Sequence, residues 1–367
     1  MKHRLSQPDI SPEDVEAVTQ VLKSPNLALG PKLGAFEKAF AAYVGAKYAV
    51  AVNSGTSALH LAVRALGIGP GYEVITTPFS FVASANCMLY ERAAPKFVDI
   101  DPVSLNIDPS KMKAAITART KAILPVHIFG LPADMKPIKE LARRYNLAVV
   151  EDACEAIGAT YEGRKVGTFG DAAAFAFYPN KQMTTGEGGV LVTDDAKVAE
   201  LAFSMRNQGR GPSGTWLDHV RLGYNYRMDE MSAALGLSQL SRINKTLERR
   251  GQVARWYGEA LADMRGVKAL PEVAGATRSW FVYVVVIDDG ARRADIMERL
   301  EIAGIECRAY FPPIHLQPFY RELFGYKEGD FPVCEDVAGR TIALPFHNAL
   351  TRAQVEEIVS ELARAMA

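Results

Sequence analysis

Short apolar runs alternate with amphipathic stretches between about residue 35 and residue 205. The short runs predict strands, and stretches with apolar positions three and four residues apart predict helices. The expected strands are 48–52, 74–77, 96–98, 122–126, 148–151, 172–177 and 189–192, and the expected helices are 57–66, 81–90, 110–116, 135–145 and 196–205. This alternation is typical of βα units around a mostly parallel sheet, which binds its ligand at the carboxyl ends of the strands.

The pattern changes after about residue 240. A long helical segment (243–264) is followed by a β-branched strand (281–287), a helix (292–303) and a terminal helix (351–365). We therefore expect an α/β protein with two domains, a large one formed by residues 1–240 and a smaller C-terminal α+β domain formed by residues 241–367.

Residues 206–228 are polar, rich in glycine and without clear periodicity. A segment of this length without regular structure is uncommon inside a compact domain unless it is functional. We expect a long functional loop here and not a linker.

Composition narrows the range of partners. The chain has 367 residues, with 42 Lys+Arg and 42 Asp+Glu, a formal net charge of +0. This balance gives no broad basic surface for nucleic acid or for an anionic membrane. Any anionic ligand must therefore meet local counter-charges or hydrogen-bond donors.

The cysteines are widely spread along the chain, at Cys87, Cys154, Cys307 and Cys334, with no CxxC pair and no Cys/His cluster. This spacing predicts free thiols and neither a metal site nor a disulfide framework. No stretch approaches the roughly 18 apolar residues of a membrane span, so we expect a soluble, cytoplasmic protein.

Residues 53–57 read Asn-Ser-Gly-Thr-Ser and lie between an expected strand and an expected helix. Such a turn directs backbone N–H groups, and hydroxyls from Ser54, Thr56 or Ser57, toward a phosphate at the start of the helix. The alternative is that these residues only cap the helix.

Two further segments carry charged side chains at the carboxyl ends of strands. Glu151 and Asp152 end an apolar strand, where a carboxylate can hold a cationic ring nitrogen or a metal, or simply cap a helix. Lys181 lies in a loop of small residues between two expected strands, where a desolvated amine becomes a nucleophile. An amine, a carboxylate, a phosphate turn and a stacking aromatic from Phe79 or Phe81 together suit pyridoxal phosphate (PLP).

In these segments the chain resembles the DegT/DnrJ/EryC/StrS family of PLP-dependent nucleotide-sugar aminotransferases. The resemblance covers nearly the whole chain and is carried by residues 53–59, 151–154, 178–189, 222–228 and 311–316. It implies fold type I of the PLP-dependent transferases, with a large PLP-binding α/β domain and a smaller C-terminal α+β domain.

The resemblance also implies a role for each catalytic residue. Lys181 would bond to the cofactor aldehyde and later move a proton between the substrate carbon and the cofactor carbon. Asp152 would keep the pyridine nitrogen protonated, which makes the ring an electron sink. Gly55 and Thr56, with Ser54 beside them, would hold the phosphate, and Phe79 would stack on the ring.

The resemblance also implies ligand contacts from the 206–228 loop and from the small domain. Asn225 would reach the phosphate from a neighbouring subunit, with Arg227 in the same loop, so that a homodimer shares its active sites. Arg308, Tyr310 and His315 fall where the family contacts the sugar or its diphosphate.

Two positions depart from the family pattern. Glu155 stands where many members have Gln or His near the cofactor's phenolic oxygen, and a carboxylate there would be repelled unless it is protonated or turned away. Ala176 stands where a serine commonly contacts the phosphate, so Ser54, Ser57 or a water would have to replace that hydroxyl.

The implied activity is transfer of an amino group from an amino acid, glutamate, to the keto carbon of a nucleotide-linked keto-deoxysugar. One alternative is the dehydratase branch of the same family, which has histidine in place of the lysine; the presence of Lys181 speaks against it. The other is a regulatory protein that senses a sugar nucleotide without turnover. The expected partners are the nucleotide sugar, the amino-acid donor and a second copy of the chain, with no nucleic acid and no membrane.

Overall fold

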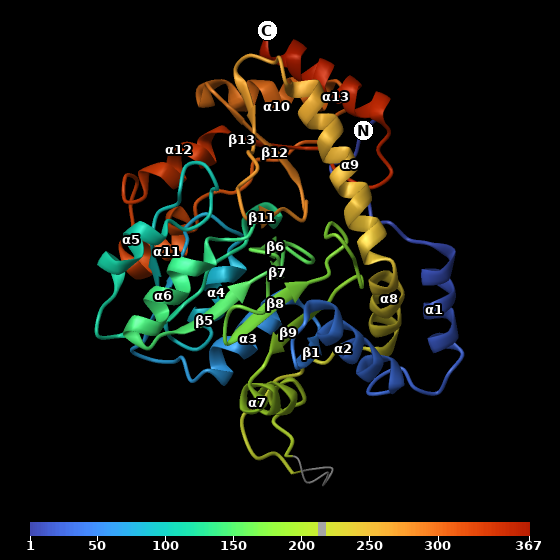
Figure 1. The fold of residues 1–367 in the computed structure, drawn as a ribbon, viewed down its shortest axis with the longest axis vertical. Coiled ribbons are helices and arrows are strands. Elements are labelled where there is room, and N and C mark those ends of the chain that lie inside the picture. Colours follow the sequence, from blue (N-terminus) through green and yellow to red (C-terminus); the bar gives the residue numbers. More distant parts are fainter. Residues whose placement is uncertain (212–217) are drawn as a thin grey trace.

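The computed structural model describes residues 1–211 and 218–367, in which a seven-stranded sheet forms the centre of the larger part (Figure 1). The strand order is β1-β9-β8-β5-β4-β2-β3. The antiparallel strand β9 lies between β1 and β8, and the remaining pairs are parallel. The bounds are β1 Tyr48–Val52, β2 Glu73–Thr76, β3 Ala94–Phe97, β4 Thr120–Ile123, β5 Ala148–Asp152, β8 Ala172–Ala176 and β9 Gly189–Thr193. The predicted mostly parallel sheet is confirmed, with β3 beginning two residues earlier than expected.

Helices cover both faces of this sheet. Side chains alternate along each strand, so Val50 and Val52 pack on one face and Ala49 and Ala51 on the other. The first face is covered by α3 (Gly55–Ala65), α4 (Ala83–Leu89) and α7 (Ala196–Arg206). The second is covered by α2 (Pro31–Val44), α5 (Pro109–Ala115), α6 (Met135–Tyr145) and α8 (Glu230–Ser241).

The N-terminal helices were not predicted. Proline at the first position and a Ser11 cap begin α1 (Pro12–Leu22), which packs on α8. The first turn of α2 is capped from far along the chain, because the Glu230 carboxylate accepts the N–H groups of Gly30, Lys32 and Leu33 at 2.7 to 3.0 Å. A cap supplied from 200 residues away leaves no local signal in the sequence.

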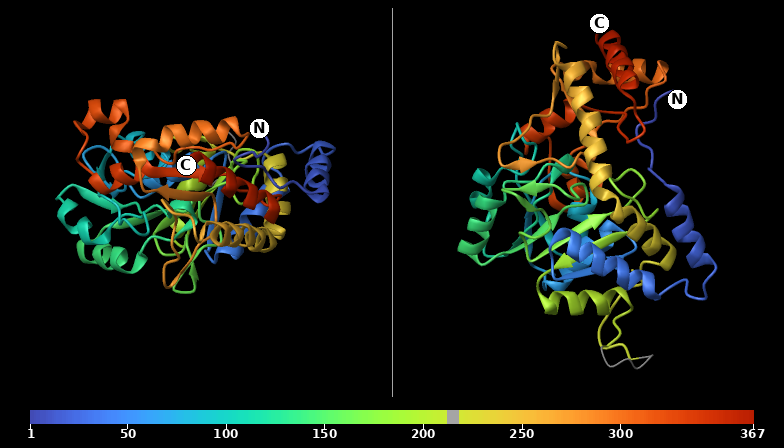
Figure 2. Two further views of the ribbon diagram at one scale, coloured as in Figure 1. Left: turned by 90° about the horizontal axis from the view of Figure 1, so that it is seen from above. Right: turned by 45° about the vertical axis from the view of Figure 1, so that its right-hand side comes forward.

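A second group of elements follows α8, and most of it lies at the top of the view in Figure 1, whereas α11 lies lower, beside α5 and α6; Figure 2 gives two further views. Its antiparallel sheet has the order β10-β12-β13 and packs against α9, α10 and α13. The bounds are α9 Ile243–Leu261, β10 Val267–Ala269, β12 Tyr283–Ile287, α10 Arg293–Ile302, α11 Pro318–Phe324, α12 Pro332–Arg340, β13 Thr341–Leu344 and α13 Arg352–Met366.

Residue 240 lies at the end of α8, directly before α9. Backbone pairing is among the contacts that cross this position. His3 pairs with Ile305, and a small sheet joins β11 (Ala276–Thr277) to β6 (Thr160–Tyr161) and β7 (Arg164–Lys165). The division of the chain into two domains at this position stays a prediction.

The segment 206–228 is more regular than expected, although residues 212–217 lie outside the described residues. Isolated bridges pair Asn207 with Asn225, and Arg210 with His219. A third bridge joins Arg227 to Val52 at the end of β1. The described part is therefore a ribbon that folds back onto the sheet.

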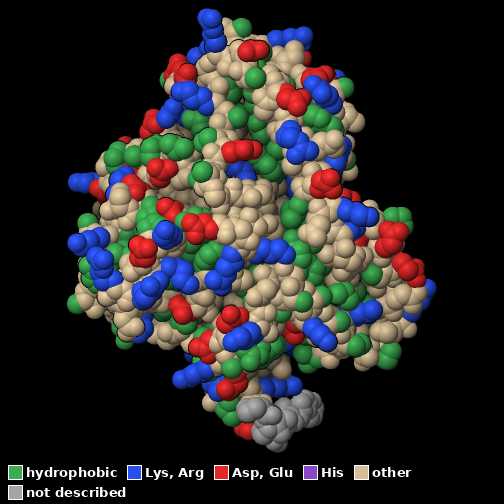
Figure 3. Space-filling view, viewed as in Figure 1, with side chains coloured by type: hydrophobic (Ala, Val, Ile, Leu, Met, Phe, Trp, Pro, Cys, Tyr) green, Lys and Arg blue, Asp and Glu red, His purple; other side chains and the backbone are tan. Residues whose placement is uncertain are grey.

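Charged side chains of both signs are mixed over the face shown in Figure 3. The four cysteines are free thiols, as expected. Within residues 1–211 and 218–367, no helix combines the length and the apolar character needed to cross a bilayer.

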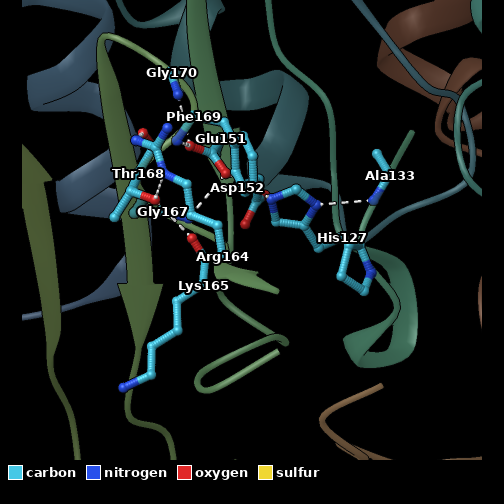
Figure 4. A network of polar contacts seen from close by, with 12 residues as sticks. His127, Ala133, Glu151, Asp152, Arg164, Lys165, Gly167, Thr168, Phe169 and Gly170 are labelled. Atoms are coloured by element: carbon cyan, nitrogen blue, oxygen red, sulfur yellow. Dashed lines mark hydrogen bonds and ion pairs between the residues drawn. The ribbon is translucent and has the colours of Figure 1, made fainter. Parts of the chain in front are cut away.

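A buried carboxylate fixes the carboxyl end of β5. Glu151 is fully buried and accepts four hydrogen bonds of 2.7 to 3.0 Å (Figure 4). The donors are the N–H groups of Gly167, Phe169 and Gly170 and the ring of His127. Burial alone would raise the pKa of this carboxyl, but His127 and the backbone donors together lower it.

The histidine in this network has a defined tautomer. Ala133 N–H donates to Nδ1 of His127 at 3.0 Å, so Nδ1 is unprotonated and Nε2–H faces Glu151. The network joins β5 to the loop before β8 and to the loop after β4, and so holds the backbone that carries Asp152.

We predict that Glu151→Gln lowers the free energy of unfolding at pH 7 by about 3 kcal/mol, because the amide NH₂ would face backbone donors. The folded-state pKa of Glu151 is lowered, so the carboxylate stabilises the fold above its unfolded pKa, and this contribution is lost as pH falls through the folded value. The difference in free energy of unfolding between wild type and Glu151→Gln should therefore become smaller as the pH is lowered. Urea titrations from pH 3 to pH 7 measure it, with the exposed Glu140→Gln as control.

Candidate active site

A cavity of about 520 Å³ opens at the carboxyl ends of the parallel strands. Its size is within the range of small-molecule sites, and it lies where an open α/β sheet places its ligand. The predicted residues that line it are Ser54, Gly55, Thr56, Asp152, Glu155, Lys181 and Tyr310. Phe79, Asn225, Arg227, Arg308 and His315 do not line it.

One end of the cavity is the first turn of α3. Ser54 is the N-cap, and its Oγ accepts the N–H of Ser57 at 3.1 Å. The N–H groups of Gly55 and Thr56 precede the first helical hydrogen bond and have no acceptor among the described residues. They are therefore free to bind an anion at the positive end of the helix.

The backbone is tightly packed around this turn. A Cβ on Gly55 would lie 2.6 Å from the Cβ of Ala176 and 3.0 Å from Sγ of Cys154. A Cβ on Gly189, at the start of β9, would lie 2.5 Å from the carbonyl of Ser54. Gly189 thus allows β9 to approach the turn, and Gly55 allows the turn to approach Cys154 and the end of β8 at Ala176.

Asp152 is buried on the face of the sheet opposite to Glu151. Its Oδ2 accepts a hydrogen bond from Ser84 Oγ at 2.7 Å, and its Oδ1 accepts the N–H of Cys154 at 3.1 Å. Because Ser84 donates to Asp152, the Ser80 hydroxyl 2.6 Å away must donate to Ser84. These bonds orient the carboxylate in the cavity wall.

Lys181 lies on the loop between β8 and β9. Its Nζ is 3.8 Å from Oε1 of Glu155 and 3.8 Å from the ring centroid of Phe281. The side chain is only 14% exposed, so the amine is held in a mostly desolvated position between an aromatic face and a carboxylate.

Glu155 is buried and close to the amine. Burial raises the pKa of its carboxyl to about 6, with Lys181 and the backbone N–H of Phe129 acting in the opposite direction. That N–H donates to Oε2 at 2.8 Å. One oxygen thus faces the backbone and the other faces Lys181.

Gln182, next to Lys181, ties its loop to the rest of the site. Its Nε2 lies 2.6 Å from the carbonyl of Glu155 and 2.8 Å from Oγ of Ser279. Ser279 lies in the loop before β12 that also carries Phe281. A single buried amide therefore holds together three segments that are distant in the sequence.

The aromatic prediction requires a correction. Phe79 is fully buried, edge-on to Phe129 and Phe311, with ring centroids 5.9 and 6.1 Å away. Phe81 lines the cavity and is 60% exposed. The residues between β2 and α4 turn Phe79 into the core, so Phe81 is the side chain available for stacking.

Asn225 and Arg227 lie beside the cavity's phosphate end without entering it. The Asn225 carbonyl is 3.5 Å from Nδ2 of Asn53, and the Asn225 residue is exposed. Arg227 donates from Nη1 to Asn207 Oδ1 at 2.9 Å. Within one chain, neither side chain contacts the turn at Gly55.

Two predicted substrate contacts are also corrected. His315 is fully buried, with Nε2 3.0 Å from Oε1 of Glu335, because the turn that carries it packs against Phe331. Arg308 is half exposed and pairs with Glu301 and Glu306, each at 3.2 Å. Neither faces the cavity.

The structure adds residues that the sequence analysis did not assign. Ser84 orients Asp152, Phe281 covers Lys181, and Oδ1 of Asn180 is buried without a hydrogen-bond partner in the described part of the chain. Asn180 is next to Lys181 in the sequence, so its position in the site could have been predicted from the sequence. Ser84 and Phe281 reach the site only through the packing of α4 and of the loop before β12.

These groups suit PLP, which the sequence motifs indicated. The amine of Lys181 matches the aldehyde, the carboxylate of Asp152 matches the ring nitrogen, and the free N–H groups at Gly55 and Thr56 match the phosphate. Asn180 Oδ1 offers an unused acceptor in the same cavity. The fold and the cavity thus define an α/β protein with a site for PLP.

Comparison with known proteins agrees with this class. Residues 8–363 match the model of the DegT/DnrJ/EryC1/StrS aminotransferase family. The chain is 44% identical over 330 residues to GDP-perosamine synthase from Caulobacter vibrioides, covering 89% of this chain and 88% of that protein. It is 41% identical over 367 residues to the spore coat polysaccharide biosynthesis protein SpsC from Bacillus subtilis, covering 96% and 94%. The solved structure of DesV from S. venezuelae superposes with a TM-score of 0.91 at 37% identity, covering 96% and 94%.

The chain therefore belongs to the DegT/DnrJ/EryC1/StrS aminotransferase family. It is a PLP-dependent aminotransferase of fold type I, and its structural neighbours include both PLP and PMP forms. The family, the fold class and the cofactor expected from the motifs are confirmed.

Glu155 generates a pH prediction for the apoprotein. The pKa of Glu155 in the folded protein, about 6, is above its value in the unfolded chain. Below the unfolded pKa the carboxyl is neutral in both states, and the fold has its full stability there. As pH rises through the folded pKa, ionisation should lower the free energy of unfolding by roughly 2 kcal/mol. Glu155→Gln removes this decrease, since the amide has no charge and its oxygen still accepts from Phe129.

Urea titrations of both apoproteins between pH 4.5 and pH 7.5 check this. The exposed Glu328→Gln is the control, because it removes a carboxyl whose side chain makes no contact with the cavity. A constant stability difference between wild type and Glu155→Gln across this range would contradict the prediction.

Proposed function

We propose that the enzyme transfers an amino group from glutamate to the keto carbon of a nucleotide-linked keto-deoxysugar. The observation that carries this proposal is the cavity that joins Lys181, Asp152 and the first turn of α3. It occurs in a chain 44% identical to a GDP-perosamine synthase, a protein named for a nucleotide-linked sugar. The product would enter a polysaccharide or a glycosylated metabolite.

Lys181 holds the central position in this reaction. When bound, PLP accepts an amino group at its aldehyde carbon and takes up the electrons left behind when a proton leaves the substrate. Nζ of Lys181 moves that proton, and the enclosed position beside Phe281 limits its exchange with water. Glu155 Oε1, 3.8 Å from Nζ, balances the charge of the amine while it is protonated.

The other residues orient the reactants. Asp152, held by Ser84, pairs with the protonated ring nitrogen. The N–H groups of Gly55 and Thr56 bind the phosphate. Ala176 adds no hydroxyl there, and the Ser54 and Ser57 hydroxyls, 2.9 Å apart, are the nearest replacements. Phe81 takes the stacking role first assigned to Phe79.

The working form is a homodimer with shared active sites. Asn225 is exposed and does not line its own chain's cavity, so it can bind the phosphate only in a second copy. Tyr310 remains a substrate contact because it lines the cavity, and Arg227 is a candidate for the sugar diphosphate of the second copy. The cytoplasmic location stays a prediction.

A half-reaction tests the activity. We expect glutamate to convert the visible absorbance band of the PLP enzyme into that of the pyridoxamine form, and a panel of keto-sugar nucleotides to restore it. Lys181→Ala should lower turnover by about 10³-fold or more, because both the bond to the cofactor and the proton transfer depend on the amine. An unchanged band would reject the aminotransferase proposal and favour a sensing role, whereas loss of a sugar hydroxyl would favour dehydration.

A mixed dimer tests the shared site. In a dimer of one Lys181→Ala chain and one Asn225→Ala chain, one site should contain both an intact Lys181 and an intact Asn225. We expect this dimer to bind PLP with wild-type affinity and to show about half the wild-type turnover, while the Asn225→Ala homodimer binds PLP about tenfold more weakly. Differently tagged chains allow the mixed dimer to be isolated, and PLP titration by visible absorbance gives the affinity. Weak binding in the mixed dimer would show that Asn225 acts in its own chain.

A further inference from the structure

A dense group of polar side chains lies outside the cavity, and the reaction described above does not use it. It consists of His60, Arg64, Glu91, Tyr224 and Tyr226, which we call the His60 cluster. Oε1 of Glu91 is 2.7 Å from Nε2 of His60 and accepts the Tyr224 hydroxyl at 2.9 Å. Oε2 of Glu91 accepts Nη1 of Arg64 at 2.6 Å.

Each proton in this cluster has an assigned position. Nε2–H of His60 donates to Glu91, so Nδ1 accepts the Tyr226 hydroxyl at 3.0 Å. The rings of Tyr224 and Tyr226 are stacked, with centroids 4.8 Å apart and planes 11° apart. Against the effect of burial, the hydrogen bonds from His60 and Tyr224 lower the pKa of Glu91, which therefore remains an acceptor for all three donors.

The two tyrosines belong to the short extended segment that carries Asn225 and Arg227. Its backbone is bonded on both sides: Asn53 N–H donates to the Tyr226 carbonyl at 2.9 Å, and Tyr226 N–H donates to the Arg206 carbonyl at 3.0 Å. Side chains alternate along an extended segment, so Tyr224 and Tyr226 face α3 while Asn225 points the other way. The hydroxyls of the tyrosines thus set the direction of the exposed Asn225 side chain.

We propose that the His60 cluster is a positioning device that holds the 224–227 segment so that Asn225 is presented to the active site of a second copy of the chain. This rests on the proposed shared site, and goes beyond it by assigning the residues that orient the contributing segment. None of the five residues touches the cavity of its own chain. The cluster therefore acts in trans, on a cofactor bound by the other subunit.

A different role would follow from the position of His60 and Arg64 on α3. That helix begins at Gly55, so in this second role the cluster would stabilise the phosphate turn of its own chain. The two roles differ in which subunit's site is weakened when the cluster is damaged, and a mixed dimer separates them.

The variant is Tyr224→Phe combined with Tyr226→Phe. It removes both hydroxyls and leaves the stacked rings, so the core is disturbed little. We expect the homodimer to bind PLP about tenfold more weakly, and no more weakly than Asn225→Ala. The unfolding midpoint of the apoprotein should decrease slightly, because Glu91 and His60 each lose one hydrogen bond. Tyr90→Phe is the matched control, because the Tyr90 ring also packs on His60, 5.2 Å away, but its hydroxyl has no partner among the described residues. Should the double variant fold poorly, Tyr224→Phe alone gives the same comparison with a smaller shift.

Two mixed dimers carry the same substitutions in different arrangements. In the first, one chain has the two tyrosine substitutions and the other has Lys181→Ala, so the site with Lys181 receives Asn225 from a chain with an intact cluster. In the second, one chain has all three substitutions and the other is wild type, so the site with Lys181 receives Asn225 from the damaged chain. Only a site with Lys181 gives the visible band, and PLP titration therefore reports that site alone.

Action in trans requires wild-type affinity in the first mixed dimer and about tenfold weaker binding in the second. The reverse pattern would assign the cluster to its own chain and overturn the proposal, as would equal affinities in the two arrangements. Failure of the shared site itself is detected separately, because the mixed dimer of Lys181→Ala and Asn225→Ala then binds PLP weakly.

Discussion

The active site depends on two adjacent carboxylates that end β5 and point to opposite faces of the sheet. Glu151 is bonded by four donors in a fully buried network, and this network fixes the backbone between β4, β5 and β8 (Figure 4). Asp152 is thereby placed in the wall of the cavity, where Ser84 sets its direction. Without the hydrogen bonds of Glu151, the end of β5 would not hold Asp152 at a fixed distance from Lys181. The reaction is sensitive to the relative positions of these two groups.

Close packing of the backbone shapes the other end of the cavity, at the start of α3. β9 runs antiparallel between β1 and β8, and its first residue approaches the turn before α3 so closely that a side chain at Gly189 would collide with Ser54. A side chain at Gly55 would collide with Ala176 at the end of β8. The chain returns from β8 to β9 through the loop that carries Lys181. Amine and phosphate turn are therefore brought together by one hairpin, and the buried amide of Gln182 attaches that hairpin to the loop before β12.

Zero net charge agrees with the way the site meets its anionic cofactor. The groups that we propose for the phosphate are backbone N–H donors and hydroxyls at the start of α3. Charged side chains of both signs are mixed over the surface seen in Figure 3. Three buried or half-buried carboxylates have local partners: Glu151 accepts from the His127 ring and backbone N–H groups, Glu155 pairs with Lys181, and Glu91 pairs with Arg64. Attraction of the substrate thus depends on local donors and not on the field of the whole protein.

Apolar periodicity and residue type determined the parallel sheet, the strand ends that carry chemistry and the fit to PLP, because these features follow from local sequence and from the edge that parallel strands share. The family was indicated by the resemblance of the motifs. Tertiary structure alone decided which of two phenylalanines faces the cavity, since Phe79 and Phe81 are equivalent by composition and differ only in the turn between β2 and α4. It also placed His315 and Arg308 outside the cavity. It revealed that Glu230 caps α2 and that Ser84 orients Asp152. The contacts of Glu230 with α2 and of Ser84 with Asp152 join residues far apart in the chain, and the packing that brings them together leaves no local pattern in the sequence.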